Sequence, residues 1–272
     1  MRLILFFLIV GSLFGAFMLI VRIRRRVRRR NALNQPFSDE WVKILEKNLP
    51  PYARLSPALR HELHQDMKIF LSEKSFEGCG GLTLTDEIRV TIAAQACMLL
   101  LNRKENCYPK LSSILVYPST YVAGGSSLFR HKSGAKSVRL GESWTHGTVV
   151  LSWDSIKHGA FNFSDGHNVT LHEFAHQLDQ EDGSGNGAPI LRDRSAYTSW
   201  ARIFSKEFTR LQEKKRKRKP SVIDKYGATN PAEFFAVATE SFFEKPKQLK
   251  KKHPELFEEL QGYYKVNPIE WT

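Results

Sequence analysis

Apolar side chains recur every three or four positions in several stretches of the chain, and this spacing predicts amphipathic helices. In the stretch that begins at Ser38, the apolar residues Trp41, Ile44 and Leu45 follow this helical spacing. Thr85 can cap the start of another stretch. The helices predicted in this way run from Ser38 and over residues 58–71, 85–101, 168–180, 196–211, 231–243 and 254–264.

Three short segments have the composition of strands. Residues 114–117, 137–140 and 148–153 are rich in β-branched or aromatic residues and are bounded by Gly, Pro or Ser. Helices therefore precede and follow a small sheet, which predicts a layered α+β domain rather than alternating βαβ units. Residues 148–153 fit either an edge strand that pairs with an extended peptide or a buried structural strand.

The first part of the chain has a different pattern. Residues 3–21 contain no charge, and as a helix 19 residues would span roughly 28 Å, close to the thickness of a bilayer core. A cleaved signal peptide carries its positive charge before the apolar stretch, whereas here seven arginines follow it, between Arg22 and Arg30. We therefore expect one uncleaved transmembrane helix whose C-terminal side stays in the cytoplasm.

The charge distribution fits this organisation. The chain of 272 residues has a formal net charge of +13. Residues 1–30 hold eight arginines and no acid, Lys214–Lys219 add six positive charges, and the remainder is close to neutral. An evenly basic nucleic-acid binder is thereby excluded, and no direct contact with nucleic acid is expected. The second basic run, with Lys245–Lys252, fits either a solvated surface or a contact with the inner leaflet.

These observations predict three parts. Residues 1–30 form a transmembrane anchor with a polybasic flank, residues 31–37 a linker, and residues 38–272 a folded domain with a helical N-terminal part. A hydrophobic content of 42% and a charged content of 25% are typical of a globular protein. Three cysteines without C-x-x-C spacing exclude a disulfide scaffold and a Cys-type zinc ribbon.

Residues 172–176 read His-Glu-Phe-Ala-His. On a helix His172 and His176 project from one face, so both can bind one zinc ion, and Glu173 beside them can act on a zinc-bound water. A catalytic zinc site needs a third protein ligand. A metzincin would need Gly at Asp179 and His at Asp182, and both are absent.

The third ligand has three candidates. No Glu lies between Glu181 and Glu207, where a thermolysin-like ligand would be expected, but Asp193 falls in that window. Glu233 has the clearest setting, because a cap at Asn230 and a proline place it in the first turn of an apolar helix. Glu240 lies two turns further along the same face, and spacing alone leaves it open.

Several blocks together resemble a known family. HEFAHQLD at 172–179 and YGATNPAEFF at 226–235 are similar to the zinc peptidases typified by Mlc titration factor A, and more distantly to the catalytic domain of anthrax lethal factor. The resemblance extends to FEGCGGLTLTDEIRVTIAAQACMLL at 76–100 and GESW…VVLSW at 141–153. It covers the chain from about Trp41 to the C-terminus.

The resemblance implies a zincin-like metallopeptidase domain with one zinc ion. It implies the ligands His172, His176 and Glu233, with Glu173 as general base and the Tyr226 hydroxyl directed at the scissile group. Asp179 lies on the histidine face and fits either an outer-shell partner or a plain helix-end aspartate.

Two functions are compatible with these features. The first is a zinc peptidase of peptide or protein substrates, anchored by one pass in the bacterial inner membrane with its catalytic domain in the cytoplasm. The second is a regulator that sequesters a transcription repressor, as the name of the titration factor implies, with peptidase activity secondary or absent.

Overall fold

The computed structural model describes residues 2–271 except 104–106, 120–121, 124–125 and 128–146. The side chains of residues 2–10, 122–123 and 126–127 also lie outside the described part. The predicted strand at 137–140 falls outside the described residues, as do the side chains of the first half of the predicted membrane span.

The predicted helices are present; those predicted at 58–71 and 196–211 extend beyond their predicted ends, whereas those predicted at 85–101 and 168–180 are shorter than predicted. Two short helices, α6 and α10, were not predicted. The helices are α1 (Arg2–Asn34), α2 (Asp39–Asn48), α3 (Pro57–Glu73), α4 (Asp86–Met98), α6 (Trp153–Phe161), α7 (Val169–Asp179), α8 (Arg194–Arg216), α9 (Pro231–Glu244), α10 (Pro246–Lys252) and α11 (Pro254–Tyr264), with 3₁₀ turns η1 (Pro50–Arg54), η2 (Lys225–Ala228) and η3 (Pro268–Trp271).

The main sheet has three parallel strands in the order β1-β2-β5. Phe76 of β1 pairs with Ile114 of β2, which pairs with Val149 of β5. Since α4 connects β1 to β2, these elements form a βαβ crossover, which the expected order of elements did not include. The strands are β1 (Ser75–Gly78), β2 (Ser113–Tyr117) and β5 (Thr148–Ser152), and a separate hairpin pairs β3 (Val122–Ala123) with β4 (Ser126–Ser127).

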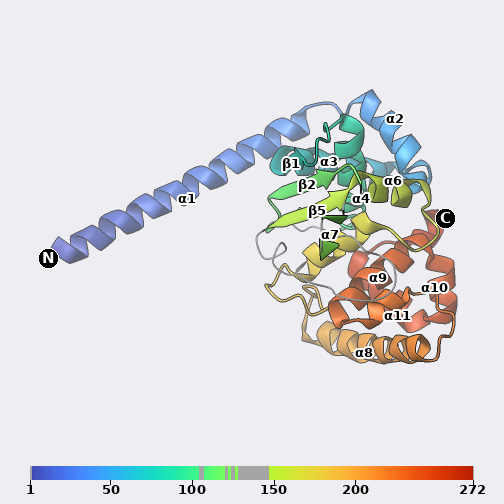
Figure 1. The fold of residues 1–272 in the computed structure, drawn as a ribbon. Helices are drawn as coiled ribbons and strands as arrows, with labels where there is room; N and C mark the ends of the chain where they lie inside the picture. The colour runs from blue at the N-terminus through green and yellow to red at the C-terminus, as the bar shows by residue number, and fades with distance from the viewer. Residues whose placement is uncertain (1, 104–106, 120–121, 124–125, 128–146, 272) are drawn as a thin grey trace.

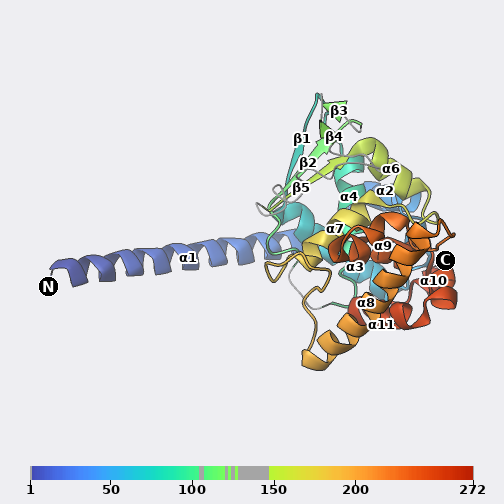
Figure 2. The ribbon, with the colours of Figure 1, turned by 60° about the horizontal axis from the view of Figure 1, so that its bottom comes forward.

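Three helices form the centre of the domain. Ten of the eleven residues of α7 are buried, and α4 and α9 are buried over nearly their whole length. A helix that is buried on all sides lies in the core rather than at the surface. Figures 1 and 2 show α7 between the sheet on one side and α8, α9 and α11 on the other, and α7 packs directly on α9. The domain thus agrees with the predicted α+β class.

Helix α1 projects from the domain as one long rod (Figures 1 and 2). It continues through residues 31–34, which were predicted to belong to a linker, because Lys68 of α3 donates to the carbonyls of Leu33 and Gln35 at the helix end. Over the part of the chain that the structure describes, no helix combines the length and apolar character needed to cross a membrane.

Candidate metal centre

Helix α7 begins at a side-chain cap. The Oδ1 of Asn168 accepts a hydrogen bond from the amide of Leu171 at 3.0 Å, which satisfies one of the free amides of the first turn. His172 and His176 then lie one turn apart, and only 3% and 7% of their surfaces are exposed. Burial of the remaining α7 side chains fixes the face on which both imidazoles lie.

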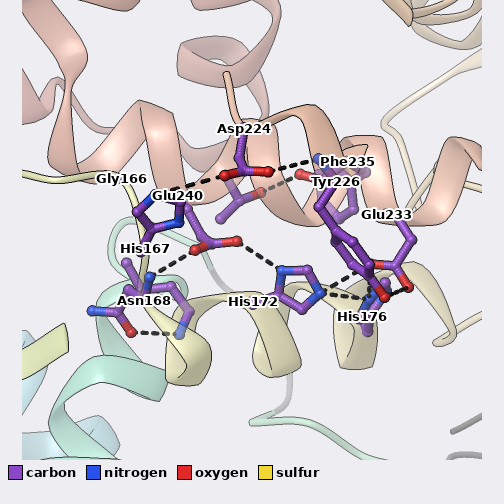
Figure 3. A network of polar contacts seen from close by, with 12 residues as sticks. Gly166, His167, Asn168, His172, His176, Asp224, Tyr226, Glu233, Phe235 and Glu240 are labelled. Atoms are coloured by element: carbon purple, nitrogen blue, oxygen red, sulfur yellow. Dashed lines mark hydrogen bonds and ion pairs between the residues drawn. The ribbon is translucent and has the colours of Figure 1, made fainter. Parts of the chain in front are cut away.

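Helix α9 begins in the predicted way. Asn230 accepts a hydrogen bond from the Glu233 amide at 2.9 Å, and Pro231 occupies the first turn. Glu233 therefore lies at the helix start with its carboxylate directed at α7 (Figure 3). Its Oε2 is 3.0 Å from Nε2 of His172 and 3.5 Å from Nε2 of His176.

The three side chains offer one compact set of ligand atoms. The two imidazole nitrogens are 3.2 Å apart, and all three ligand atoms lie within 4.8 Å of one another. Two histidines and one glutamate are a ligand set of catalytic zinc sites, in which one further position stays open. The residues present therefore fit one metal ion, and His172, His176 and Glu233 are brought together as predicted.

Electrostatics within the cluster are strong. Burial alone would raise the pKa of Glu233, but hydrogen bonds with His172 and His176 outweigh it and hold this pKa well below its usual range. Burial lowers the pKa of His176, which favours the neutral imidazole that binds metals. Burial opposes a charged imidazole at His172, but hydrogen bonds with Glu233 and Glu240 outweigh it and raise the pKa of His172. Glu233 and His176 thus favour the protonation states that metal ligands require, whereas His172 would release a proton when a metal binds.

The other two candidate ligands lie elsewhere. Glu240 approaches the opposite nitrogen of the first histidine, with its Oε1 2.7 Å from Nδ1 of His172, and its Oε2 accepts a hydrogen bond from the amide of Asn168 at 2.6 Å. Asp193 is partly exposed and caps α8 by accepting a hydrogen bond from the Ala196 amide. Glu240 is therefore an outer partner of the cluster, and Asp193 is outside it.

Glu173 and Tyr226 border the same cluster. Burial raises the pKa of Glu173 to about 8, and the charges of Glu233 and Glu240 add to this effect. Tyr226 lies on η2, where Asp224 accepts a hydrogen bond from its amide at 2.6 Å. The Tyr226 hydroxyl donates to Oε1 of Glu233 at 3.4 Å (Figure 3). Burial raises the pKa of this hydroxyl, so the group remains a donor.

Asp179 binds a loop rather than either histidine. Its two carboxylate oxygens accept the amide of Gly187, each at 2.9 Å, and the Trp200 indole donates to the Gly187 carbonyl at 2.9 Å. Gly187 has φ +79°, and a Cβ there would lie 2.3 Å from the carbonyl oxygen of Pro231. Asp179 thus holds this loop against the start of α9, two residues before Glu233.

Sequence reasoning did not assign the roles of Glu240 and Asn168. Glu240 follows Glu233 by seven residues, so its place on the same face of α9 was a usable signal for a residue near the cluster. Asn168 directly precedes the apolar helix, in the usual position of a cap. Neither signal distinguishes a metal ligand from an outer hydrogen-bond partner.

Comparisons with known proteins identify relatives that match most of the chain. A protein of Synechocystis sp., the uncharacterized protein slr2042, is 43% identical over 247 residues, which cover 89% of each chain. Mlc titration factor A of Serratia proteamaculans is 32% identical over 73% of this chain and 77% of its own length. The Klebsiella pneumoniae (strain 342) protein of that name is 30% identical, over 85% and 87%.

The match to a family extends well beyond the metal cluster. Residues 23–265 match the family described as glucose-regulated metallo-peptidase M90. This span includes the arginine-rich end of α1, the sheet and every residue of the candidate metal centre. The chain therefore belongs to the M90 family of metallopeptidases.

Proposed function

We propose that this protein is a zinc-dependent peptidase that hydrolyses peptide bonds at the cluster between α7 and α9. The observation that carries the proposal is the convergence of His172, His176 and Glu233 within 4.8 Å in a buried setting. Zinc bound there would supply Lewis-acid chemistry that makes water nucleophilic near neutral pH. Membership of a metallopeptidase family supports the same reading.

Glu173 has the position of a general base. It follows His172 directly and is 8% exposed, so its carboxylate is shielded from bulk solvent. In the proposed reaction the carboxylate accepts a proton from the attacking water and returns it to the leaving amine. A buried carboxyl with a raised pKa suits both transfers, since it binds and releases a proton near neutral pH.

Tyr226 has the position of a hydrogen-bond donor. Its hydroxyl lies beside Glu233, and its ring centroid is 6.1 Å from that of His172. We propose that this hydroxyl donates a hydrogen bond to the oxygen of the scissile carbonyl, where negative charge develops during attack. A preorganised donor of this kind stabilises the transition state more than the ground state.

Strand β5 is suited to hold the substrate backbone. Within the described residues β5 pairs with β2 on one side only, and it contacts α7. An extended peptide can add to such an edge through main-chain hydrogen bonds. We propose that the substrate lies along β5 and presents its scissile bond to the metal centre.

We further propose that α1 anchors the protein in the bacterial inner membrane, with the domain on the cytoplasmic side. Large apolar side chains of α1 are exposed, including Leu13 at 66%, Phe14 at 64% and Phe17 at 61%. Exposed apolar area of this size calls for an apolar partner such as lipid. The arginines that follow favour cytoplasmic retention of the domain.

The experiment uses the full chain in detergent and a mixed peptide library. Hydrolysis is expected, with loss on chelation and recovery on addition of zinc. Glu173→Gln is expected to abolish turnover while the protein keeps its zinc. Hydrolysis that persists after chelation, or undiminished turnover in Glu173→Gln, would contradict the proposal.

A second function is favoured by the names of two relatives, which are called Mlc titration factor A. We propose that this chain likewise binds and sequesters a transcription repressor. A pull-down should then recover one repressor with wild type and Glu173→Gln alike. Recovery of no DNA-binding protein by either form would rule this function out.

A further inference from the structure

The arginine-rich segment of α1 is bound to the domain through one carboxylate, that of Glu73. Arg25 donates to both oxygens of Glu73, at 2.9 and 3.0 Å, and Arg29 donates to the same carboxylate from the next turn. The Glu73 side chain is only 7% exposed. Burial opposes ionisation, but the two guanidinium groups outweigh it and lower the pKa of Glu73 to about 2. The contact is a bidentate, partly buried ion pair.

The segment after the helix is held as well. Lys68 is 8% exposed and donates to the carbonyls of Leu33 and Gln35, each at 2.9 Å. Phe37 then stacks on His64 of α3, with ring centroids 3.7 Å apart. From Arg25 to Phe37 the chain is therefore in repeated contact with α3, and no free linker separates helix and domain.

The arginines of α1 differ in how far they are exposed. Arg25 and Arg29 are one turn apart and half-buried against the domain. Arg22, Arg24, Arg26, Arg28 and Arg30 are exposed. Arg28 also donates to the carbonyl of Ser72 at 3.5 Å. The other exposed arginines can meet lipid phosphates, while the half-buried pair is already bound to Glu73.

Helical geometry places this contact close to the lipid. Arg25 follows Val21, the last residue of the apolar stretch, by four residues or roughly 6 Å along the helix. The headgroup layer on each side of a bilayer is about 5–8 Å thick. A helix inserted up to Val21 would bring the domain directly against the headgroups.

We propose that α1 and the peptidase domain form one rigid body that holds the active site at a fixed height above the membrane. The substrates are then segments beside the membrane in proteins anchored in the same leaflet, because a soluble peptide gains nothing from this geometry. The inference rests on the proposed anchoring and on the proposed peptidase activity.

The second basic run, Lys214–Lys219 with Lys245–Lys252, does not lie on the side of the domain that would face the membrane. Arg210 of α8 donates to the carbonyl of Lys252 at 3.3 Å, so the end of α8 that carries Lys214 lies beside the end of α10. Figures 1 and 2 both place α10 on the side of the domain away from the projecting end of α1. The arginines of α1 are thus the cations placed to meet the anchoring leaflet.

The rigid body is tested by a distance measurement on the full chain in vesicles of phosphatidylcholine and phosphatidylglycerol. Spin labels are placed on the native Cys79 and on Gly11→Cys. Wild type should give one narrow distance distribution, and the double variant Arg25→Gln, Arg29→Gln a broad one. The double variant Arg26→Gln, Arg30→Gln makes the same charge change at the same spacing on exposed positions and should stay narrow. Equal widths in all three proteins would overturn the rigid body.

The substrate class is tested with a cleavable peptide tethered to lipid through linkers of graded length. Wild type should cleave best within a narrow range of linker lengths, and the Arg25, Arg29 variant should lose this preference while cleaving the untethered peptide at an unchanged rate. A flat dependence on linker length in wild type would overturn the inference. Failure of the protein to float with vesicles would refute the anchoring, and absence of cleavage of any peptide would refute the peptidase, so these failures are distinguishable.

Discussion

Glu240 lies on the side of His172 that faces away from the candidate metal centre, with Oε1 2.7 Å from Nδ1, and both side chains are almost fully buried. With Nδ1 protonated and bonded to this carboxylate, Nε2 keeps its lone pair free for a metal. The second oxygen of Glu240 binds the Asn168 amide at the start of α7. One carboxylate thus orients both the imidazole and the helix that carries it.

Replacement of Glu240 should weaken metal binding. We expect Glu240→Ala to lower zinc affinity about 10–100-fold, which is typical when an outer-shell partner of a metal-bound histidine is lost. Competition with a chromophoric chelator measures this. Glu244→Ala is the matched control, because Glu244 is buried one turn further along α9 and binds the amides of Gly166 and His167 and the side chain of Asn168, but neither histidine of the cluster. Equal losses of affinity in the two variants would refute the role of Glu240.

Tyr226→Phe should impair turnover without loss of the metal. Removal of one donor to a developing oxyanion costs roughly 10²–10³-fold in kcat, and we expect a loss of that order with an unchanged KM. Zinc content should remain at the wild-type level, since the hydroxyl is a neighbour of Glu233 rather than a ligand. Tyr197→Phe removes a hydroxyl on α8 that accepts the Leu191 amide, and it should leave kcat unchanged. A normal kcat in Tyr226→Phe would exclude the assigned role.

Gly187→Ala should disturb the cluster from a distance. The new methyl group would collide with the Pro231 carbonyl, push away the start of α9 and displace Glu233. We expect a loss of stability of about 1–3 kcal/mol from the collision and a lower zinc affinity. Gly183→Ala is the control: it also places a side chain at positive φ, but among the described residues its Cβ would meet only the Lys110 amine, at 3.6 Å. If both variants bind zinc equally well, the Gly187 contact does not position Glu233.

The Glu73 contact should make stability depend on pH in acid. The folded-state pKa of Glu73 is about 2, below its ordinary value of 4.5. The stabilisation of the folded state by this ion pair is therefore fully present above about pH 5 and is lost as pH falls from 4.5 towards 2. One pKa unit corresponds to about 1.4 kcal/mol, so the total is at most about 3.5 kcal/mol, and partial exposure of the arginines reduces it.

The measurement compares the free energy of unfolding of wild type and Glu73→Gln at a series of pH values. The difference should be constant above pH 5 and shrink below pH 4.5. A difference that grows on acidification would show that the carboxylate is not stabilised by the two arginines.

Much of the metal centre could be predicted from the sequence, because its signals are local. The two histidines are four residues apart on one helix, and Glu233 lies three residues after the cap of another. Each signal therefore spans about one helical turn. The resemblance to a family then favoured Glu233 over Glu240. Spacing alone did not make this choice, because both residues lie on one face of α9.

The contacts that sequence reasoning missed join residues far apart in the chain. Glu73 is 48 residues from Arg25, and no local pattern indicates their pairing. Strand β1 has four residues, too few for a visible alternation, so the parallel crossover went unpredicted. Helix α6 begins at Trp153, which was predicted to end the preceding strand because aromatic residues are enriched in strands.

The central claim is that His172, His176 and Glu233 hold one catalytic zinc ion. The most direct measurement is the zinc content per chain of the full-length protein, with peptide hydrolysis followed in parallel, for wild type, Glu233→Gln and Glu173→Gln. We predict one zinc ion and hydrolysis in wild type, little zinc and no hydrolysis in Glu233→Gln, and one zinc ion without hydrolysis in Glu173→Gln. Full hydrolysis by the metal-depleted protein, or normal zinc binding in Glu233→Gln, would contradict the account.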